Sequence, residues 1–200
     1  MKIIGLTGPS GAGKGFCYSF FDSYNIPCID TDKVYHDLLI PPSDCVDELT
    51  AFFGKGIIDN SGCVDRKILA QMVFSDKSHE KLEKLNQITH KYVLCKTKEA
   101  LSEYERKNFV AAVVDAPLLF ESGFDKLCDF SIAVLSGKEK RVERIMARDA
   151  LTKKAALMRV NAQKDDGFYS SMAQYTILND TDEQALNSQL FNVLKQENII

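Results

Sequence analysis

A glycine-rich segment, lying between a short apolar run and a helical pattern, constrains this chain more than any other feature. The run Lys2–Thr7 predicts a buried strand, because it is mostly apolar and Gly8-Pro9 stops it. The seven residues 8–14, Gly-Pro-Ser-Gly-Ala-Gly-Lys, fit the pattern G-x-x-x-x-G-K, and a helix is predicted from near Gly13. Strand, loop and helix in this order favour a parallel sheet with the loop at the carboxyl end of its first strand.

Further strand patterns alternate with helical patterns along the chain. Strands are predicted at 26–29, 109–114, 128–135 and 175–178. The run 109–114 is almost wholly apolar, as a central strand covered on both faces should be. We therefore predict an α/β fold of the P-loop NTPase-like class, with a five-stranded, parallel, doubly wound sheet.

Helical periodicity without a convincing strand fills the region between the second and third predicted strands. We predict one domain with a core at 1–32 and 108–200, a helical insertion at about 33–107, and a helical lid at about 138–165. Capping patterns predict the starts of two helices, Ser136 to Glu139 before the lid and Thr181 to Gln184 before the last helix.

Length and charge exclude several classes of protein. The chain has 200 residues, enough for one domain with a real core, and 25 basic against 28 acidic residues give a formal charge of −3. No overall positive field exists to hold nucleic acid or an anionic membrane, and no apolar stretch approaches the roughly 18 residues of a membrane span. We expect a cytoplasmic protein, a monomer or weak homo-oligomer, whose six scattered cysteines are reduced thiols.

The glycine loop is suited to a nucleoside triphosphate. Backbone N–H groups of residues 11–15 can point inward around phosphate oxygens, and Lys14 can meet the β and γ phosphates as a point charge. Position 15 is Gly, where this pattern normally has Ser or Thr to hold Mg²⁺, and Phe16 follows. ATP is the expected cofactor, and Mg²⁺ would be held through water, phosphate oxygens and a nearby carboxylate.

Carboxylates follow two of the predicted strands. Asp30 and Asp32 come after the second strand, where a carboxylate can orient or deprotonate an attacking hydroxyl. Asp30 or Thr31 suits the cap of the next helix, which leaves Asp32 for catalysis. Asp115 follows the third strand and is the candidate acid near Mg²⁺, with a turn or capping role as the alternative.

Three arginines recur at helical spacing after the fourth strand. Arg141, Arg144 and Arg148 are three and four residues apart, so they share one helix face. A guanidinium row near the phosphates can neutralise charge in phosphoryl transfer, and the alternative is a solvated amphipathic face.

These motifs resemble, in order and over nearly the whole chain, the dephospho-coenzyme A kinases. Residues 5–14 are similar to the opening G-L-T-G-G-I-G-S-G-K of that family, and Ile29-Asp30-Thr31-Asp32 resembles its I-D-A-D. Further similar segments are Phe53-Gly54, Gly62 to Arg66 with Leu69 and Val73-Phe74, Pro117 to Glu121, Arg144 with Arg148-Asp149, Arg159 to Gln163, and Ala173 to Asn179. Departures are Gly15, Lys91 in place of a proline after His90, Gln174 in place of Asp, and Arg141 in place of Gln.

The resemblance implies roles for particular residues. Asp32, Lys14, Arg144 and Arg148 are the expected catalytic residues, and dephospho-coenzyme A is the expected acceptor. The resemblance assigns ATP to Gly8, Ser10, Gly11, Ala12, Gly13, Lys14, Gly15, Phe16 and Asn179, and the acceptor to Asp32, Arg66, His90, Leu118, Glu121 and Gln163.

The expected reaction is transfer of the γ-phosphoryl group of ATP to the ribose 3′-hydroxyl of dephospho-coenzyme A. Two alternatives remain open at this point. The loop also resembles that of several nucleoside and nucleoside-monophosphate kinases, although Phe16 stands where those have Thr. The second alternative is a nucleotide-binding protein with impaired catalysis. The absence of the usual Ser or Thr hydroxyl at position 15 supports it.

Overall fold

Five parallel strands form the sheet that carries the glycine loop, in the spatial order β2-β3-β1-β4-β5. The computed structural model describes all 200 residues. The predicted five-stranded parallel sheet is confirmed, and strand boundaries differ from the predicted ones by up to two residues. The strands are β1 (Lys2–Thr7), β2 (Cys28–Asp30), β3 (Ala111–Asp115), β4 (Phe130–Leu135) and β5 (Tyr175–Leu178).

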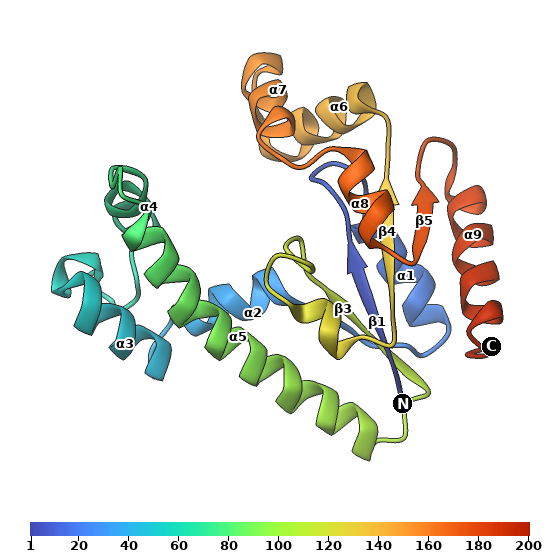
Figure 1. Cartoon of the computed structure of the whole chain (residues 1–200), viewed down its shortest axis with the longest axis horizontal. Helices are drawn as coiled ribbons and strands as arrows, with labels where there is room; N and C mark the ends of the chain where they lie inside the picture. Colours follow the sequence, from blue (N-terminus) through green and yellow to red (C-terminus); the bar gives the residue numbers. More distant parts are fainter. The chain divides into compact units, whose positions relative to one another are not determined.

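Two helices cover one face of this sheet (Figure 1). Helix α1 (Gly15–Ser23) follows the loop, and α9 (Glu183–Gln196) closes the chain. Alternate residues of β4, Phe130, Ile132 and Val134, pack with these helices in the main core because successive strand side chains point to opposite faces. Because β1 and α1 both pack in this core, the loop that joins them is held at the carboxyl end of β1.

The opposite face of β4 packs against a shorter helix. Ala133 and Leu135 of β4 contact Tyr169 of α8 (Asp166–Met172). Before α8 come α6 (Lys138–Asp149) and α7 (Lys153–Asn161), which pack together through Val142 and Ile145 of α6 and Ala156 and Val160 of α7. A 3-10 turn, η2 (Phe124–Leu127), precedes β4.

The other helices follow β2 along the chain. They are α2 (Thr31–Leu38), α3 (Asp44–Phe53), the 3-10 turn η1 (Lys55–Ile57), α4 (Arg66–Phe74) and α5 (Glu80–Arg106). The chain divides into two compact units, Met1–Ile29 with Leu101–Ile200, and Asp30–Ala100. None of the helices combines the length and the apolar character that a membrane span requires.

The capping pattern predicted at Ser136 is wrong. Gly137 is the residue before α6, and no side chain caps that helix. The Ser136 hydroxyl instead donates to Asp180 Oδ1 at 2.8 Å, and Gly137 N–H donates to the same oxygen at 2.8 Å. At the last helix the cap is Asp182, which accepts from Ala185 N–H, rather than a reciprocal pair of Thr181 and Gln184.

Candidate active site

The loop after β1 has a backbone that only glycine adopts readily at three positions. Gly8, Gly11 and Gly13 have φ of +142°, +80° and +94°. A Cβ on Gly8 would lie 2.2 Å from the carbonyl oxygen of Val134, and a Cβ on Gly13 would lie 2.2 Å from Asn179 Nδ2. Glycine is therefore required by both conformation and close packing, as the sequence pattern predicts.

Four backbone amides of the loop have no acceptor within the protein. The N–H groups of Gly11, Gly13, Lys14 and Gly15 make no hydrogen bond, whereas Ala12 N–H donates to Pro9 O at 3.1 Å. The last of the four opens α1, so the partial positive charge of a helix N-terminus adds to theirs. Such a group of donors is suited to several oxygens of one anion.

Lys14 and Asp115, two predicted site residues, lie together at this loop. Lys14 Nζ donates to Gly8 O at 3.1 Å and lies 3.9 Å from Asp115 Oδ1. Tyr18 donates its hydroxyl to Asp115 Oδ2 at 2.7 Å. Sequence reasoning missed Tyr18, although it lies one helical turn beyond Lys14 and so shares its face of the helix.

Arg144 of α6 holds the backbone of the loop from outside. Its NH1 donates to Gly11 O at 3.2 Å and to Ala12 O at 3.1 Å, and its NH2 donates to Asn179 O at 3.0 Å. In a trans peptide the C=O of Ala12 and the N–H of Gly13 point in opposite directions. Binding the carbonyl to Arg144 therefore turns the Gly13 amide away from the arginine.

Asn179 binds the same carbonyl oxygen, that of Ala12. It is 5% exposed, and its Nδ2 donates to Ala12 O at 2.9 Å. Phe16 at the start of α1 is 54% exposed, and the guanidinium carbon of Arg144 lies 6.0 Å from its ring centre. The structure thus places the Asn179 side chain on the loop backbone and leaves the Phe16 ring accessible.

Arg141 is buried, so the solvated-face interpretation does not apply to it. It is 4% exposed, and its Nε donates to Ser10 O at 3.1 Å while its NH2 donates to Gln163 Oε1 at 3.2 Å. Its NH1 lies 3.4 Å from Asp166 Oδ1. Burial lowers the pKa of the Arg141 guanidinium, and the charge of Asp166 opposes that shift.

Arg148, by contrast, is exposed and lies beside the loop hydroxyl. It donates from Nε and NH2 to both oxygens of Asp149 at 2.8 and 2.9 Å, and its NH2 lies 3.4 Å from Ser10 Oγ. Arg159 contacts the same carboxylate at 2.6 Å. The hydrogen bond from Arg148 lowers the pKa of Asp149, which keeps this carboxylate charged.

The unit Asp30–Ala100 contains three further predicted polar site residues, Asp32, Arg66 and His90. Asp32 is exposed at the second position of α2, and Asp30 caps that helix by accepting from Lys33 N–H at 3.0 Å, as one of the sequence interpretations had it. Arg66 is exposed at the first position of α4. His90 is half-buried on α5, and burial lowers its pKa.

Leu118 and Glu121 lie in the other unit, in the turns after β3. Leu118 is 51% exposed, and Glu121 is exposed as well. Their contact with the acceptor stays a prediction.

The donors near the loop fit a Mg²⁺ ion that keeps most of its water. No group of three or more His, Cys, Asp or Glu residues could enclose a metal, and Gly15 supplies no hydroxyl. Asp115 is the carboxylate that accompanies Lys14. One carboxylate with phosphate oxygens and water is a usual Mg²⁺ environment in phosphoryl-transfer sites.

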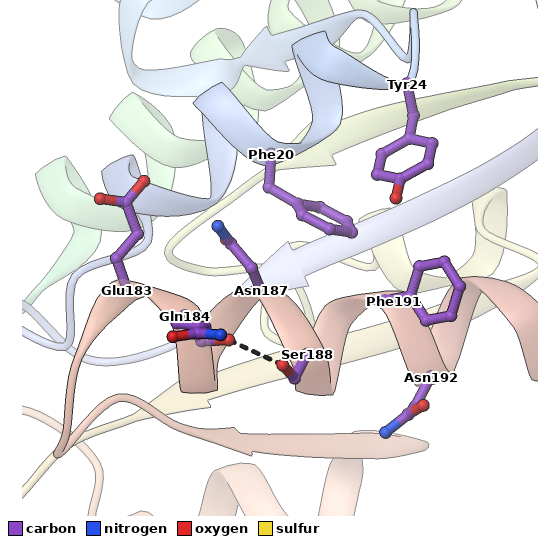
Figure 2. A pocket seen from close by; sticks show the side chains of 8 residues that line it. All are labelled: Phe20, Tyr24, Glu183, Gln184, Asn187, Ser188, Phe191 and Asn192. Carbon is purple, nitrogen blue, oxygen red and sulfur yellow. Dashed lines mark hydrogen bonds between the residues drawn. The ribbon is translucent and has the colours of Figure 1, made fainter.

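A separate groove of about 680 Å³ lies between α1 and α9 (Figure 2). Phe20, Tyr24 and Phe191 contribute aromatic rings, and the other lining residues are Glu183, Gln184, Asn187, Ser188 and Asn192. The lining contains no lysine or arginine. It is therefore unsuited to a polyphosphate, and the loop remains the site for an anion.

The loop follows the first strand of a parallel sheet, and it combines unpaired backbone amides, a lysine and closely packed glycines. This combination defines a P-loop kinase. The family model described as CoaE, dephospho-CoA kinase, matches residues 2–185. The chain belongs to the dephospho-CoA kinase family, as the sequence resemblance predicted.

Curated relatives and solved structures agree with this assignment. The dephospho-CoA kinase of Lactobacillus johnsonii is 33% identical over 194 residues, covering 97% of each chain. The dephospho-CoA kinase from Campylobacter jejuni has a TM-score of 0.70 and 28% identity, covering 98% of each chain. A Thermus thermophilus structure has a TM-score of 0.82 at 28% identity, covering 98% of this chain and 97% of that one. Shikimate kinase from Acinetobacter baumannii, with 14% identity and a TM-score of 0.56, shares the fold.

Proposed function

We propose that this chain phosphorylates dephospho-CoA at the ribose 3′-hydroxyl with ATP, giving CoA and ADP. Membership of the family and the four unpaired loop amides support this proposal. The acceptor oxygen forms a bond to the γ phosphorus as the bond from that phosphorus to the β,γ-bridging oxygen breaks. ADP leaves, and the hydroxyl proton passes to a carboxylate.

The donor side of the reaction uses the loop. The amides of Gly11, Gly13, Lys14 and Gly15 bind oxygens of the triphosphate, and the Lys14 ammonium approaches the β and γ phosphates. Because charge spreads over the equatorial oxygens in the transition state, fixed donors stabilise it without reorganising. Arg144 keeps the loop in shape and Arg148 is the exposed guanidinium beside it.

On the acceptor side, Asp32 is the proposed base. It lies two residues after the end of β2 and is exposed in the first turn of α2, where a carboxylate can accept the proton of a sugar hydroxyl. The proposed contacts of the acceptor are Arg66, His90, Leu118, Glu121 and Gln163. Closure of the helical insertion and of the lid, residues 138–165, would exclude water that otherwise hydrolyses ATP.

Magnesium is the proposed divalent metal. Asp115 would hold it through water, together with phosphate oxygens of ATP, and the bound ion would offset negative charge on the triphosphate. Tyr18, which donates to Asp115 at 2.7 Å, orients the carboxylate. ATP, dephospho-CoA and a cytoplasmic location complete the proposal.

An acceptor panel tests this function. ADP release is measured with ATP and Mg²⁺ in the presence of dephospho-CoA, CMP, UMP or uridine, and the product is identified by mass spectrometry. We expect ADP release that depends on dephospho-CoA and yields CoA. Release with CMP, UMP or uridine instead would support a nucleoside or nucleotide kinase, and no acceptor-dependent release would support a protein with impaired catalysis.

A further inference from the structure

Tyr18 brings a hydroxyl to the glycine loop from one helical turn further along α1. It lies four residues after Lys14 and three after Gly15, so it neighbours both on the helix surface. The Cα–Cβ bonds of a helix tilt toward its N-terminus, and a long side chain therefore reaches back along the axis. The Tyr18 hydroxyl accordingly lies at the loop end of α1, where it donates to Asp115 Oδ2 at 2.7 Å.

The two oxygens of the Asp115 carboxylate contact different groups. Oδ2 accepts from Tyr18, and Oδ1 lies 3.9 Å from Lys14 Nζ. The Asp115 side chain is 11% exposed, so its orientation depends on protein neighbours rather than on bulk water. A carboxylate oxygen has two lone pairs, and one that accepts from a hydroxyl keeps the capacity to bind a further ligand.

The Tyr18 ring is itself held by packing. It is half-buried and packs against the main core, to which Cys17 and Phe21 of the same helix belong. A side chain whose ring is packed and whose hydroxyl is bound keeps one orientation, which a group that positions a metal ligand requires. Tyr18 therefore fixes the direction in which the Asp115 carboxylate faces.

The other hydroxyl side chains of residues 7–19 are engaged elsewhere. The Thr7 hydroxyl donates to Pro117 O at 3.4 Å, and the Ser19 hydroxyl donates to Phe16 O at 3.1 Å. Ser10 Oγ lies 3.4 Å from NH2 of Arg148. Among these residues, the hydroxyl that contacts Asp115 is therefore that of Tyr18.

Position 15 gives this contact its importance. In the pattern G-x-x-x-x-G-K-[ST] the Ser or Thr hydroxyl binds Mg²⁺, and this chain has Gly15 instead. A Cβ on Gly15 would meet nothing within 4 Å, so no neighbouring atom occupies the place of the missing side chain. Without the loop hydroxyl, binding of the proposed ion depends more strongly on the direction of the Asp115 carboxylate.

We propose that Tyr18 is a positioning residue for the divalent ion of the triphosphate, and that its hydroxyl, acting through Asp115, compensates for the hydroxyl missing at Gly15. The inference rests on the proposed function. Groups that orient a metal ligand typically change metal affinity about 10–100-fold when they are removed. If positions 15 and 18 serve the same ion, the effects of changing them are not additive.

Nucleotide binding with and without the ion tests this role, and it needs neither acceptor nor turnover. The dissociation constant of the non-hydrolysable ATP analogue AMP-PNP is measured by calorimetry on the full chain, once in EDTA and once with Mg²⁺. The ratio of the first constant to the second is the magnesium gain. Tyr18→Phe removes the hydroxyl and keeps the ring. We expect it to lower the magnesium gain at least about fivefold while leaving the constant in EDTA within about twofold of wild type.

Tyr175→Phe is the matched control. Tyr175 is also half-buried, packs against the same core and donates to a carboxylate oxygen, Glu197 Oε1, at 2.7 Å. It lies at the first residue of β5, whereas the loop is at the carboxyl end of β1. We expect Tyr175→Phe to leave the magnesium gain unchanged.

A second variant tests the compensation directly. Adding Gly15→Ser to Tyr18→Phe should return the magnesium gain to within about twofold of wild type, because the loop hydroxyl then meets the ion without Tyr18. Circular dichroism checks the fold of each variant. Tyr18→Leu, which likewise lacks the hydroxyl, gives the same comparison if Tyr18→Phe does not fold.

The outcomes separate this inference from a structural role and from the proposed reaction. Equal weakening of AMP-PNP binding with and without Mg²⁺, an unchanged magnesium gain, or no recovery with Gly15→Ser would refute it. The expected pattern in a protein that fails the acceptor panel would refute the reaction and leave the role of Tyr18 standing. A protein that yields CoA in the panel while Tyr18→Phe keeps its magnesium gain would retain the function and lose this inference.

Discussion

The side-chain oxygen Oε1 of Gln163 accepts a hydrogen bond from the backbone N–H of Ser10, with 2.9 Å between the two atoms. The same oxygen accepts from the buried Arg141, whose Nε holds the Ser10 carbonyl. The Ser10 carbonyl is therefore bound by a residue of α6, and the Ser10 N–H is bound by a residue that follows α7. This arrangement makes Gln163 a positioning residue for the loop, in addition to its proposed place near the acceptor.

Replacing Gln163 by Leu should weaken ATP binding more than turnover. Leu has a similar volume but leaves Ser10 N–H and one Arg141 donor without this acceptor, and a hydrogen bond to a charged group contributes about 1.5–3 kcal/mol. We expect KM for ATP to rise about tenfold, with a smaller change in kcat. Gln163→Glu, which keeps an acceptor oxygen, should restore most of the affinity. Equal KM values for ATP in wild type and Gln163→Leu would refute the positioning role.

Removing the loop ammonium should abolish most activity. Lys14→Ala is expected to lower kcat by at least about a hundredfold, because Lys14 is the one basic residue of the loop, residues 8–14, and its charge stabilises the transferring phosphoryl group. Steady-state ADP release and a melting curve measure the effect on rate and fold. Lys195→Ala, which alters an exposed lysine on α9, is the matched control and should retain wild-type rates. A Lys14→Ala protein of near wild-type kcat would contradict the mechanism.

The acceptor side has its own pair of variants on α2. Asp32→Asn keeps the shape of the side chain and removes its capacity to take the hydroxyl proton, so kcat should fall by at least about a hundredfold. Asp37→Asn removes one charge from an exposed residue of the same helix and should have little effect. Similar kcat losses in the two variants would indicate a general electrostatic effect and argue against Asp32 as the base.

The sheet and loop were predictable because their signals are local. The apolar runs predicted all five strands, and the spacing of three glycines predicted the loop that the backbone angles require. Contacts made by residues far apart in sequence were not predictable. Ser136 resembles a cap by its neighbours, yet its hydroxyl donates to Asp180, which is 44 residues away.

The different burial of Arg141 and Arg148 was likewise not predictable from local sequence. Arg141 and Arg148 share a helix face by spacing, but Arg141 is 4% exposed under the segment that contains Gln163, while Arg148 remains exposed. Helical periodicity predicts the direction in which each side chain leaves the helix axis. It does not predict which of these side chains a neighbouring segment of the chain will cover. The partner of Asp115, Tyr18, was missed for the same reason, since the contact joins α1 to the end of β3.

Glycine at position 8 should be essential for stability, and glycine at position 15 should not. A Cβ on Gly8 would lie 2.2 Å from a backbone oxygen at a φ of +142°, whereas a Cβ on Gly15 meets nothing within 4 Å. We expect Gly8→Ala to lower the free energy of unfolding by at least about 2 kcal/mol. A lowering of the melting temperature by several degrees would be the readout. Gly15→Ala should leave stability unchanged or slightly raised, because Ala is the better helix former. Equal melting temperatures for the two variants would contradict the close packing at Gly8.

The same open space at position 15 allows a test of how magnesium is held. Gly15→Ser places a hydroxyl at the first residue of α1, where nothing within 4 Å obstructs it. Hydroxyl oxygen is a suitable Mg²⁺ ligand, so a direct contact can replace one that water provides in the native chain. We expect the Mg²⁺ concentration for half-maximal ADP release to fall at least about threefold. Gly15→Ala controls for the gain in helix propensity and should not shift it. If Ser and Ala shift the Mg²⁺ dependence equally, or if neither does, position 15 does not face the metal, and the assignment of Asp115 to the same ion loses its support.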